Sequence, residues 1–271
     1  MTKLRREAIR ELLKIKPFLS YEELGALFPD VSEMTLRRDI EYFENSGEAI
    51  KVRGGARSAR FITSSTDEAM SARMNSNVLP KERIAQCAAQ LLETDRSIFL
   101  DSGSTVQSMA SFVPAGRFTF TTTNPALALE LCRSGQSTVN IVGGRLDRDY
   151  QSVSGLQAMR YLADVNIDAA FLSPSGLSAR SGFTGGNYAE CELKRYVAEK
   201  ASRVIMLMDS SKIERSLPYT FCTLAGVSVL ITDRPLSAEL SEQAQSHGVR
   251  VICTDVREAV KRFINNPKGR E

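Results

Sequence analysis

Several residue types are scarce in this chain of 271 residues, and each scarcity excludes a kind of site. Tryptophan is absent, and there is a single histidine, His247, which stands beside Gly248 ahead of an apolar run. One histidine rules out metal sites built from several histidines, and it argues against a Ser-His-Asp triad. We therefore interpret His247 as a loop residue.

Cysteines are few, and long apolar runs are missing. The cysteines are odd in number and form no C-x-x-C pair: Cys87, Cys132, Cys191, Cys222 and Cys253. This pattern argues against a disulfide framework or a zinc site and fits a reducing compartment. No apolar run approaches the roughly 18 residues of a membrane span, and the charged N-terminus lacks the apolar core of a signal peptide. We expect a cytoplasmic protein with no metal, no cofactor and no membrane partner.

The chain also lacks a strong charge of either sign, because its formal net charge is only +3. Its composition is ordinary for a folded protein, with 42% hydrophobic and 25% charged residues. The length suffices for a small domain plus a larger one, each with its own core. Any binding of nucleic acid must therefore come from local placement of charge rather than from a globally basic surface.

The first 57 residues contain the signals of a helix-turn-helix. Residues 4–15 have a helical pattern that Pro17 ends, and Ser20 and Glu23 form a capping box that opens a short helix at 21–28. A Pro-Asp turn follows, and then Ser32 can cap a third helix. The order of helix, short helix, tight turn and helix predicts a helix-turn-helix.

The third helix has one apolar stripe and an opposite polar face. Leu36, Ile40 and Phe43 fall at i, i+4 and i+7 and share the inner face. Gly47 can stop the helix, and the short run 48–53 with the glycines after it is typical of a basic wing. Arginine binds guanine bidentately or neutralises phosphate. The expected DNA-reading residues are Ser32, Met34, Thr35, Arg37, Arg38, Tyr42, Lys51, Arg53, Gly54 and Gly55.

An arginine pair alone is more typical of an ordinary solvated helix face, but the surrounding pattern reverses this interpretation. S-x-x-T-x-R-R-D-I runs from Ser32 to Ile40, then comes Gly47, then R-G-G-A from Arg53 to Ala56. This pattern resembles the DeoR family of bacterial transcription regulators, whose members usually carry histidine where this chain has Arg53. The resemblance implies a winged helix-turn-helix over residues 1–57 that binds a double-stranded DNA operator.

Beyond this region the pattern changes twice. Residues 58–80 are rich in serine and small polar residues, which we interpret as a linker with a short helix near 67–74. From 81 to 271, segments of helical and strand character alternate, which predicts an α/β domain with a mostly parallel sheet covered on both faces. The expected strands are 97–100, 118–122, 138–142, 169–173, 204–208, 227–232 and 249–253, and the expected helices are 81–92, 104–112, 125–134, 155–162, 189–201 and 237–247.

Polar residues recur in the loops after these strands, where ligands bind in such sheets. The loop Asp101–Thr105 opens a helix whose amides and hydroxyls can hold an anion such as phosphate. Each loop alone is more typical of a turn, but together they suit a polyhydroxylated, phosphorylated molecule. Glu190 and Lys194 are spaced i, i+4 on the expected helix 189–201, and the other candidates come from the loops: Asp101, Ser102, Gly103, Ser104, Thr105, Thr123, Asn124, Gly143, Gly144, Gly176, Asp209 and Lys212.

The family resemblance continues here in IFLDSGST, TTN, VGG, D-x-x-F-L-x-x-x-G, G-F-T, E-x-x-x-K and MDSSK. It implies a sensor domain similar in fold to ribose-phosphate isomerases and CoA transferases. In the family this domain senses phosphorylated sugars or related metabolites, so the loop and helix residues above become effector-binding candidates. Two departures stand out, Ser104 where threonine is commoner and the run Ser173-Pro-Ser where glycine, alanine and aspartate are frequent.

These observations predict a transcription regulator rather than an enzyme. We expect a repressor of carbohydrate metabolism genes that is modulated by a phosphorylated sugar and works as a homo-oligomer, a dimer or a tetramer. An isomerase-like enzyme using Glu190, Lys194 and Asp209 is the alternative, although an attached DNA reader would be superfluous to it and no paired catalytic motif stands out. A third interpretation is a sensor domain that only oligomerises.

Overall fold

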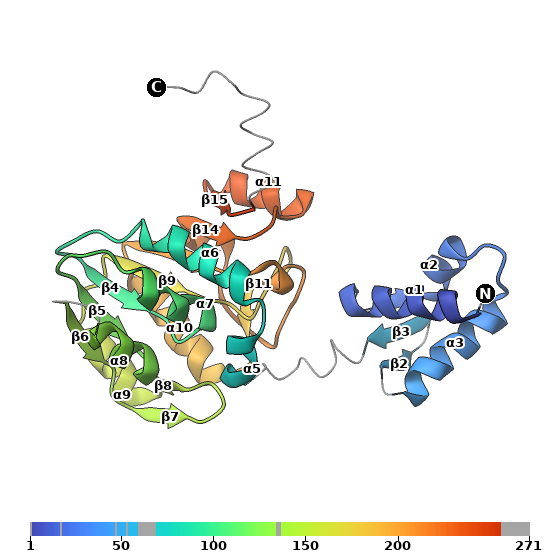
Figure 1. Cartoon of the computed structure of the whole chain (residues 1–271), viewed down its shortest axis with the longest axis horizontal. Coiled ribbons are helices and arrows are strands. Elements are labelled where there is room, and N and C mark those ends of the chain that lie inside the picture. Colours follow the sequence, from blue (N-terminus) through green and yellow to red (C-terminus); the bar gives the residue numbers. More distant parts are fainter. Residues whose placement is uncertain are drawn as a thin grey trace, which may run out of the picture. The chain divides into compact units, whose positions relative to one another are not determined.

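The chain forms two compact units that divide between Thr66 and Asp67. The computed structural model describes residues 2–16, 18–46, 48–52, 54–58, 69–133 and 137–255 (Figure 1). The division falls inside the range 58–80 that we expected to be a linker. Helix α5 (Met70–Asn75) and the start of α6 (Val78–Ala89) lie in that range, and Met70 is fully buried in the larger unit. Residues 59–68 of the expected linker lie outside the described residues.

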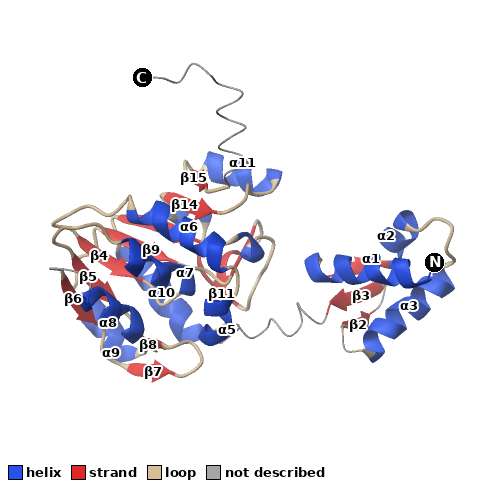
Figure 2. Ribbon diagram, viewed as in Figure 1, coloured by secondary structure: helices blue, strands red, loops and turns tan. Residues whose placement is uncertain are grey.

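The smaller unit combines helices with a short antiparallel sheet (Figure 2). Its described elements are α1 (Thr2–Ile15), β1 (Phe18–Ser20), α2 (Tyr21–Leu27), α3 (Glu33–Asn45), β2 (Ala49–Val52) and β3 (Gly55–Ser58). The strand order is β1-β3-β2, so the hairpin that follows α3 is completed by the strand that precedes α2. This is a winged helix-turn-helix, as the sequence predicted.

Local signals in the sequence explain these helices. Ser20 Oγ accepts a hydrogen bond from the Glu23 amide at 3.0 Å, and Ser32 Oγ accepts one from the Thr35 amide at 3.4 Å, so both helices are capped. The stripe of Leu36, Ile40 and Phe43 is buried against α1, α2 and the sheet. The helix stop that we assigned to Gly47 lies outside the described residues.

The larger unit contains a parallel sheet in the order β15-β14-β12-β9-β4-β5-β6. Its strands are β4 (Ser97–Leu100), β5 (Thr119–Thr122), β6 (Thr138–Ile141), β9 (Ala169–Leu172), β12 (Arg203–Leu207), β14 (Val229–Thr232) and β15 (Arg250–Cys253). Alternate residues enter two separate cores: Ile98 and Leu100 face α6 and α8 (Pro125–Arg133), whereas Phe99 faces α9 (Leu156–Ala163) and α10 (Tyr188–Lys200). Helix α11 (Ala238–Ser246) joins the second core.

The strand order reverses at β4. From β4 the chain adds β5 and β6 on one side, and it then returns to place β9 on the other side. The carboxyl ends of β4 and β9 therefore meet at a topological switch point, which is where ligands bind in open α/β sheets.

Strand β1 of the smaller unit was not expected from the sequence, and neither were several elements of the larger unit. They are the hairpin of β7 (Arg145–Asp147) and β8 (Ser152–Ser154), the antiparallel strands β10 (Gly176–Ser178), β11 (Gly182–Gly185) and β13 (Tyr219–Cys222), and the short helices η3 (Ser210–Lys212) and η4 (Leu224–Gly226). The expected helix 104–112 is α-helical only as α7 (Ser104–Gln107) and continues as the 3-10 helix η2 (Ser108–Phe112). Among the described residues, no helix has the length and apolar character needed to cross a bilayer.

Candidate DNA-reading helix and effector site

The face of α3 opposite the core presents the residues that we expected to read DNA. Arg37 and Arg38 are both exposed, and so are Met34 at 64% and Tyr42 at 41% of their surface. Thr35 is half-buried and its hydroxyl lies 3.0 Å from Ser32 Oγ at the helix start. Neither arginine enters the core, so both side chains are available to a groove.

Arg37 is nevertheless oriented by its neighbours. Its Nη2 lies 2.7 Å from Glu33 Oε1, and its guanidinium carbon lies 4.6 Å from the centre of the Tyr21 ring. The hydrogen bond with Glu33 raises the pKa of Arg37, so the group is charged at any physiological pH. Water screens an exposed pair of this kind, so the pair is too weak to prevent the Arg37 guanidinium from turning to another anion or acceptor.

The wing is fastened to α3. Lys51 Nζ lies 2.6 Å from Glu41 Oε1, and the Lys51 amide donates to Glu44 Oε1 at 3.2 Å. Gly54 turns the hairpin with φ of 87°, and Gly55 is packed so closely that an added Cβ would lie 2.1 Å from the Leu19 carbonyl oxygen. Arg53, which we also placed in the wing, lies outside the described residues.

One residue of the R-R-D motif has a role that the sequence did not reveal. Asp39 is 1% exposed, and its two carboxylate oxygens accept hydrogen bonds from Arg5 Nε at 2.6 Å and Arg6 Nε at 2.7 Å. The Arg6 guanidinium also lies 4.1 Å from the centre of the Tyr42 ring. Asp39 therefore joins α3 to α1 and sets the orientation of the reading helix. In the sequence, this role was indicated only by the position of Asp39 beside the apolar stripe of α3.

In the larger unit, the switch point holds a buried ion pair. Asp101, directly after β4, accepts a hydrogen bond from the Ser173 amide at 3.0 Å through Oδ2. The same oxygen lies 2.9 Å from Lys194 Nζ, which also donates to the Ser173 carbonyl at 2.8 Å. Residues from the ends of β4 and β9 and from α10 are thus joined in one network, and sequence reasoning placed two of its three members in the site.

Glu190 lies one helical turn before Lys194 and is also buried. Its Oε1 accepts hydrogen bonds from Ser102 Oγ at 3.2 Å and from Ser152 Oγ. Burial raises the pKa of Glu190, against the opposing effects of Lys194 and Ser152. For Lys194, burial works to lower the pKa, but Asp101 and Glu190 outweigh it, and the pKa is raised. Ser152 was not expected because its hairpin strand carried no recognisable pattern.

The loops after β4 and β5 pack on each other. Asn124 Nδ2 donates to the Ser102 carbonyl at 3.4 Å and to Gln107 Oε1 at 3.0 Å. A Cβ on Gly103 would lie 2.5 Å from Ser173 Cβ, so this close approach requires glycine. Three further expected residues are buried here: Thr123 in the loop after β5, and Ser104 and Thr105 at the start of α7.

A second group surrounds Asp209, which lies two residues after the end of β12. Asp209 Oδ1 accepts hydrogen bonds from Asn77 Nδ2 at 2.9 Å and from the Ser211 amide at 3.1 Å, and Lys212 is buried in the turn that follows. Asp209 Oδ2 is buried without a hydrogen-bond partner among the described residues, and so is Nε of Arg73 on α5. Asn77 and Arg73 fall in the range assigned to a linker, which is why they were not expected here.

The charges of this second group are near those of the first. Arg73 acts on the pKa of Glu190, and its guanidinium carbon lies 5.5 Å from the Tyr150 ring centre. A cavity of about 230 Å³ is bordered by residues of α6, α7 and η2, among them Lys81, Ser104 and Gln107, and it shares Ser104 with the loop that follows β4. Neither Arg73 nor Asp209 lines this cavity, so their unpartnered atoms are a separate observation.

Three expected glycines do not belong to this network. Gly143 and Gly144 are exposed after β6, where a Cβ on Gly144 would lie 2.7 Å from the Ser154 carbonyl oxygen. Gly176 lies in β10, where a Cβ would lie 2.4 Å from the Arg215 carbonyl oxygen. The close backbone contacts of Gly144 and Gly176 explain these two glycines without a ligand, and Gly143 has no such neighbour.

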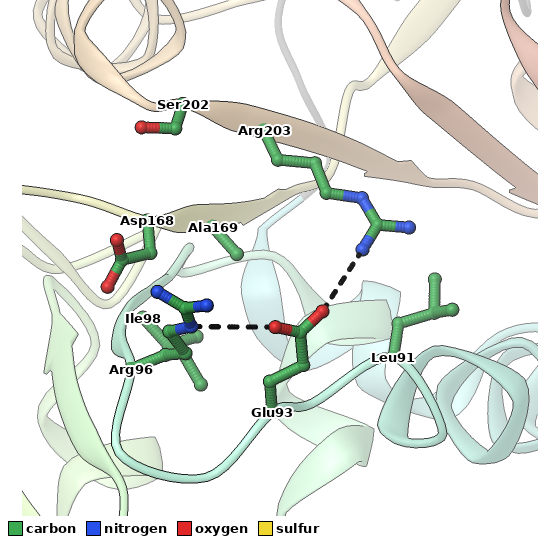
Figure 3. Close-up of a pocket in the computed structure, with 8 residues that line it drawn as sticks. All are labelled: Leu91, Glu93, Arg96, Ile98, Asp168, Ala169, Ser202 and Arg203. Atoms are coloured by element: carbon green, nitrogen blue, oxygen red, sulfur yellow. Dashed lines mark ion pairs between the residues drawn. The ribbon is translucent and has the colours of Figure 1, made fainter.

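Another cavity of about 230 Å³ opens at the opposite ends of the strands (Figure 3). There Glu93 lies between Arg96 and Arg203, at 3.5 Å and 3.7 Å. Two carboxylates, Glu93 and Asp168, balance the two arginines of the lining, so this cavity has no net positive charge to attract an anion. The polar network at the carboxyl ends is therefore the stronger ligand site.

A winged helix-turn-helix joined to an α/β unit with a polar switch-point cluster defines a two-domain DNA-binding regulator. Residues 5–60 match the DeoR-like helix-turn-helix domain, and residues 76–234 match the DeoR C terminal sensor domain. The chain therefore belongs to the DeoR family of transcriptional regulators, as the sequence pattern indicated, and the relatives are regulators rather than enzymes.

Individual relatives span nearly the same length. The HTH-type transcriptional regulator GlpR of Haloferax volcanii is 31% identical over 222 residues, which cover 82% of this chain and 86% of the relative. The glycerol-3-phosphate regulon repressor of Escherichia coli K12 is 24% identical and covers 92% and 98%. A ribose 5-phosphate isomerase A from Methanocaldococcus jannaschii is a more distant likeness, with a TM-score of 0.37, 16% identity and coverage of 51% and 55%.

Proposed function

We propose that this protein represses carbohydrate metabolism genes and that a phosphorylated sugar or polyol sets its affinity for the operator. The observation that carries the proposal is the buried polar network at the switch point, in a chain whose other unit presents two exposed arginines on α3. An effector that favours one arrangement of the sensor units changes the spacing of the reading helices. Because its target is chromosomal DNA, we place this activity in the cytoplasm.

The chemistry of the network suits a molecule with both a phosphate and hydroxyl groups. Cationic side chains lie within or beside it, and the guanidinium of Arg73 has a buried Nε without a partner among the described residues. Carboxylates accept hydrogen bonds from hydroxyls, and Asp209 has one buried oxygen that also lacks a partner among the described residues. We propose that the phosphate binds near Arg73, Lys212 and the start of α7 at Ser104 and Thr105, and that a sugar hydroxyl binds Asp209.

A panel of sugar and polyol phosphates tests the effector. A ligand at about 100 times its dissociation constant should stabilise the larger unit by about 2.7 kcal/mol in a thermal melt. Arg73→Gln should abolish the shift, whereas the matched substitution Arg83→Gln, at an exposed position of α6, should leave it intact. If no phosphorylated compound shifts the melt of the wild-type chain, the sensor assignment is wrong and the unit serves only oligomerisation.

Operator binding is tested with a duplex selected by the full-length protein from a random library. Arg37→Ala and Arg38→Ala should each weaken binding by roughly 1–3 kcal/mol if the arginine contacts a base. Arg83→Ala, which removes the same charge from the larger unit, is the control. If both α3 variants bind like wild type at a fixed salt concentration, the reading-helix assignment fails.

We further propose a homo-oligomer, a dimer or a tetramer, because two half-sites separated by about one turn of DNA require two readers. The outer edge of β6 supports this proposal. Among the described strands only β5 pairs with β6, and the sequence Thr-Val-Asn-Ile carries no charge or proline to block pairing with a second copy. Ile141→Lys at this edge should lower the mass measured by sedimentation, while Leu79→Lys, also at an exposed position but on α6, should not.

A further inference from the structure

Met34 is an apolar side chain in an unusual place. It is 64% exposed in the first turn of α3, whereas Met70, Met109, Met206 and Met208 are fully buried. The fold does not use it, because the core of the smaller unit is formed by the opposite face of the helix. An exposed thioether on the face that approaches DNA requires another explanation.

Charged residues near Met34 on α3 are engaged in ion pairs, and this bears on what Met34 can contact. On the outward face of α3, Glu41 is held by Lys51 of the wing, and Arg37 is held by Glu33. Arg38 is exposed one helical turn after Met34, so the two side chains are about 6 Å apart along the helix axis. That distance corresponds to one or two base-pair steps of about 3.4 Å each.

We propose that Met34 determines base specificity by contacting the 5-methyl group of a thymine, while Arg38 binds a guanine one or two base pairs away. The proposal rests on the DNA-binding function proposed above. The thymine methyl is the apolar feature of the major-groove edge of a base pair. A thioether has no hydrogen-bond donor and is a weak acceptor, so it cannot read the polar groups of the other bases. Its unbranched, flexible chain can follow the methyl group closely.

Parallel selections from random duplexes test this assignment, because the protein itself then picks the operator sequence. The libraries are prepared with thymine, or with uracil in its place, which removes the methyl group and keeps the pairing edge. Full-length wild-type protein and the variants Met34→Ala and Met34→Leu select from each library. Met74→Ala, at an exposed methionine of the larger unit, is the control.

For the wild-type protein, we expect one position in each half-site to prefer thymine in the first library and to lose that preference in the uracil library. Binding to the selected site should weaken about three- to tenfold when that single thymine becomes uracil. Met34→Ala should show no such preference and no such loss, Met34→Leu should retain both, and Met74→Ala should match wild type.

The outcomes separate this inference from the function on which it rests. If no sequence is enriched by any of the proteins, the DNA-binding function itself fails. If sequences are enriched but Met34→Ala keeps the same thymine preference and the same sensitivity to uracil as wild type, the DNA-binding function stands and the role of Met34 is overturned.

Discussion

Replacing Asp39 by asparagine should loosen the DNA-binding unit more than its single lost charge suggests. The carboxylate is buried, and each of its oxygens receives a hydrogen bond from a different arginine of α1, at 2.6 Å and 2.7 Å. Asparagine keeps the shape but turns one of the acceptors into an NH₂ donor. That donor then faces a guanidinium N–H, and two donors repel each other.

The size of the expected loss of stability depends on how exposed the two arginine partners of Asp39 are. Each hydrogen bond to a charged group contributes about 1.5–3 kcal/mol, and removing one partner of a buried ion pair costs about 3–5 kcal/mol. The side chains of Arg5 and Arg6 are 12% and 30% exposed, so hydrogen bonds to water can replace part of the hydrogen bonding that the two arginines lose. We therefore expect a loss of about 2–4 kcal/mol. A unit of this size has a free energy of unfolding of roughly 3–10 kcal/mol, so the change is a large fraction of the total.

Hydrogen exchange on the full-length protein is the appropriate assay, because it reports the smaller unit separately from the larger one. Amides of α3 should lose protection by about 2–4 kcal/mol in Asp39→Asn, while amides of β4 and β9 should not change. Asp30→Asn, at an exposed aspartate in the turn before α3, is the control. Surface substitutions usually change stability by no more than about 0.5 kcal/mol. If the protection of α3 amides in Asp39→Asn stays within about 0.5 kcal/mol of wild type, the reasoning is refuted.

Three further predictions follow from the glycines and from Glu190. Gly25 lies inside α2 with no atom within 4 Å of an added Cβ, so Gly25→Ala should stabilise the smaller unit by about 0.5–1 kcal/mol in the same exchange assay. Gly55→Ala should instead destabilise that unit by about 1–3 kcal/mol, because its Cβ would collide with the Leu19 carbonyl and separate β1 from β3. Burial raises the pKa of Glu190 above 4.5. Between the pKa of the unfolded chain and the higher pKa of the folded chain, the folded chain keeps a proton that the unfolded chain releases. The free energy of unfolding of the larger unit therefore falls as the pH rises from about 4.5 through the pKa of the folded state. Glu190→Gln should remove that fall in urea titrations at a series of pH values, and an unchanged slope would contradict it.

The sequence predicted the elements that have strong local signals. The capping residues Ser20 and Ser32 and the stripe of α3 placed the helix-turn-helix, and short apolar runs between helices placed the strands of the parallel sheet. The rule that ligands bind at the carboxyl ends of strands pointed to Asp101, and the E-x-x-x-K pattern of the family pointed to Lys194, which the folded chain brings together in one ion pair. The hairpin β7–β8 and the strands around Gly176 and Gly182 were not predicted, because three- or four-residue strands do not develop a readable alternation.

The charged residues that were missed show what a sequence cannot reveal. Asp39 and Arg73 are both buried, but only the contacts of the folded chain distinguish them. Each oxygen of Asp39 has a partner, so its burial is explained by the structure of the smaller unit. Arg73 has a buried Nε without a partner among the described residues, and Asp209 has a buried carboxylate oxygen that likewise lacks one. Leaving such groups unpaired costs about 1–3 kcal/mol each, which is the physical reason for the proposal that a bound effector pairs them.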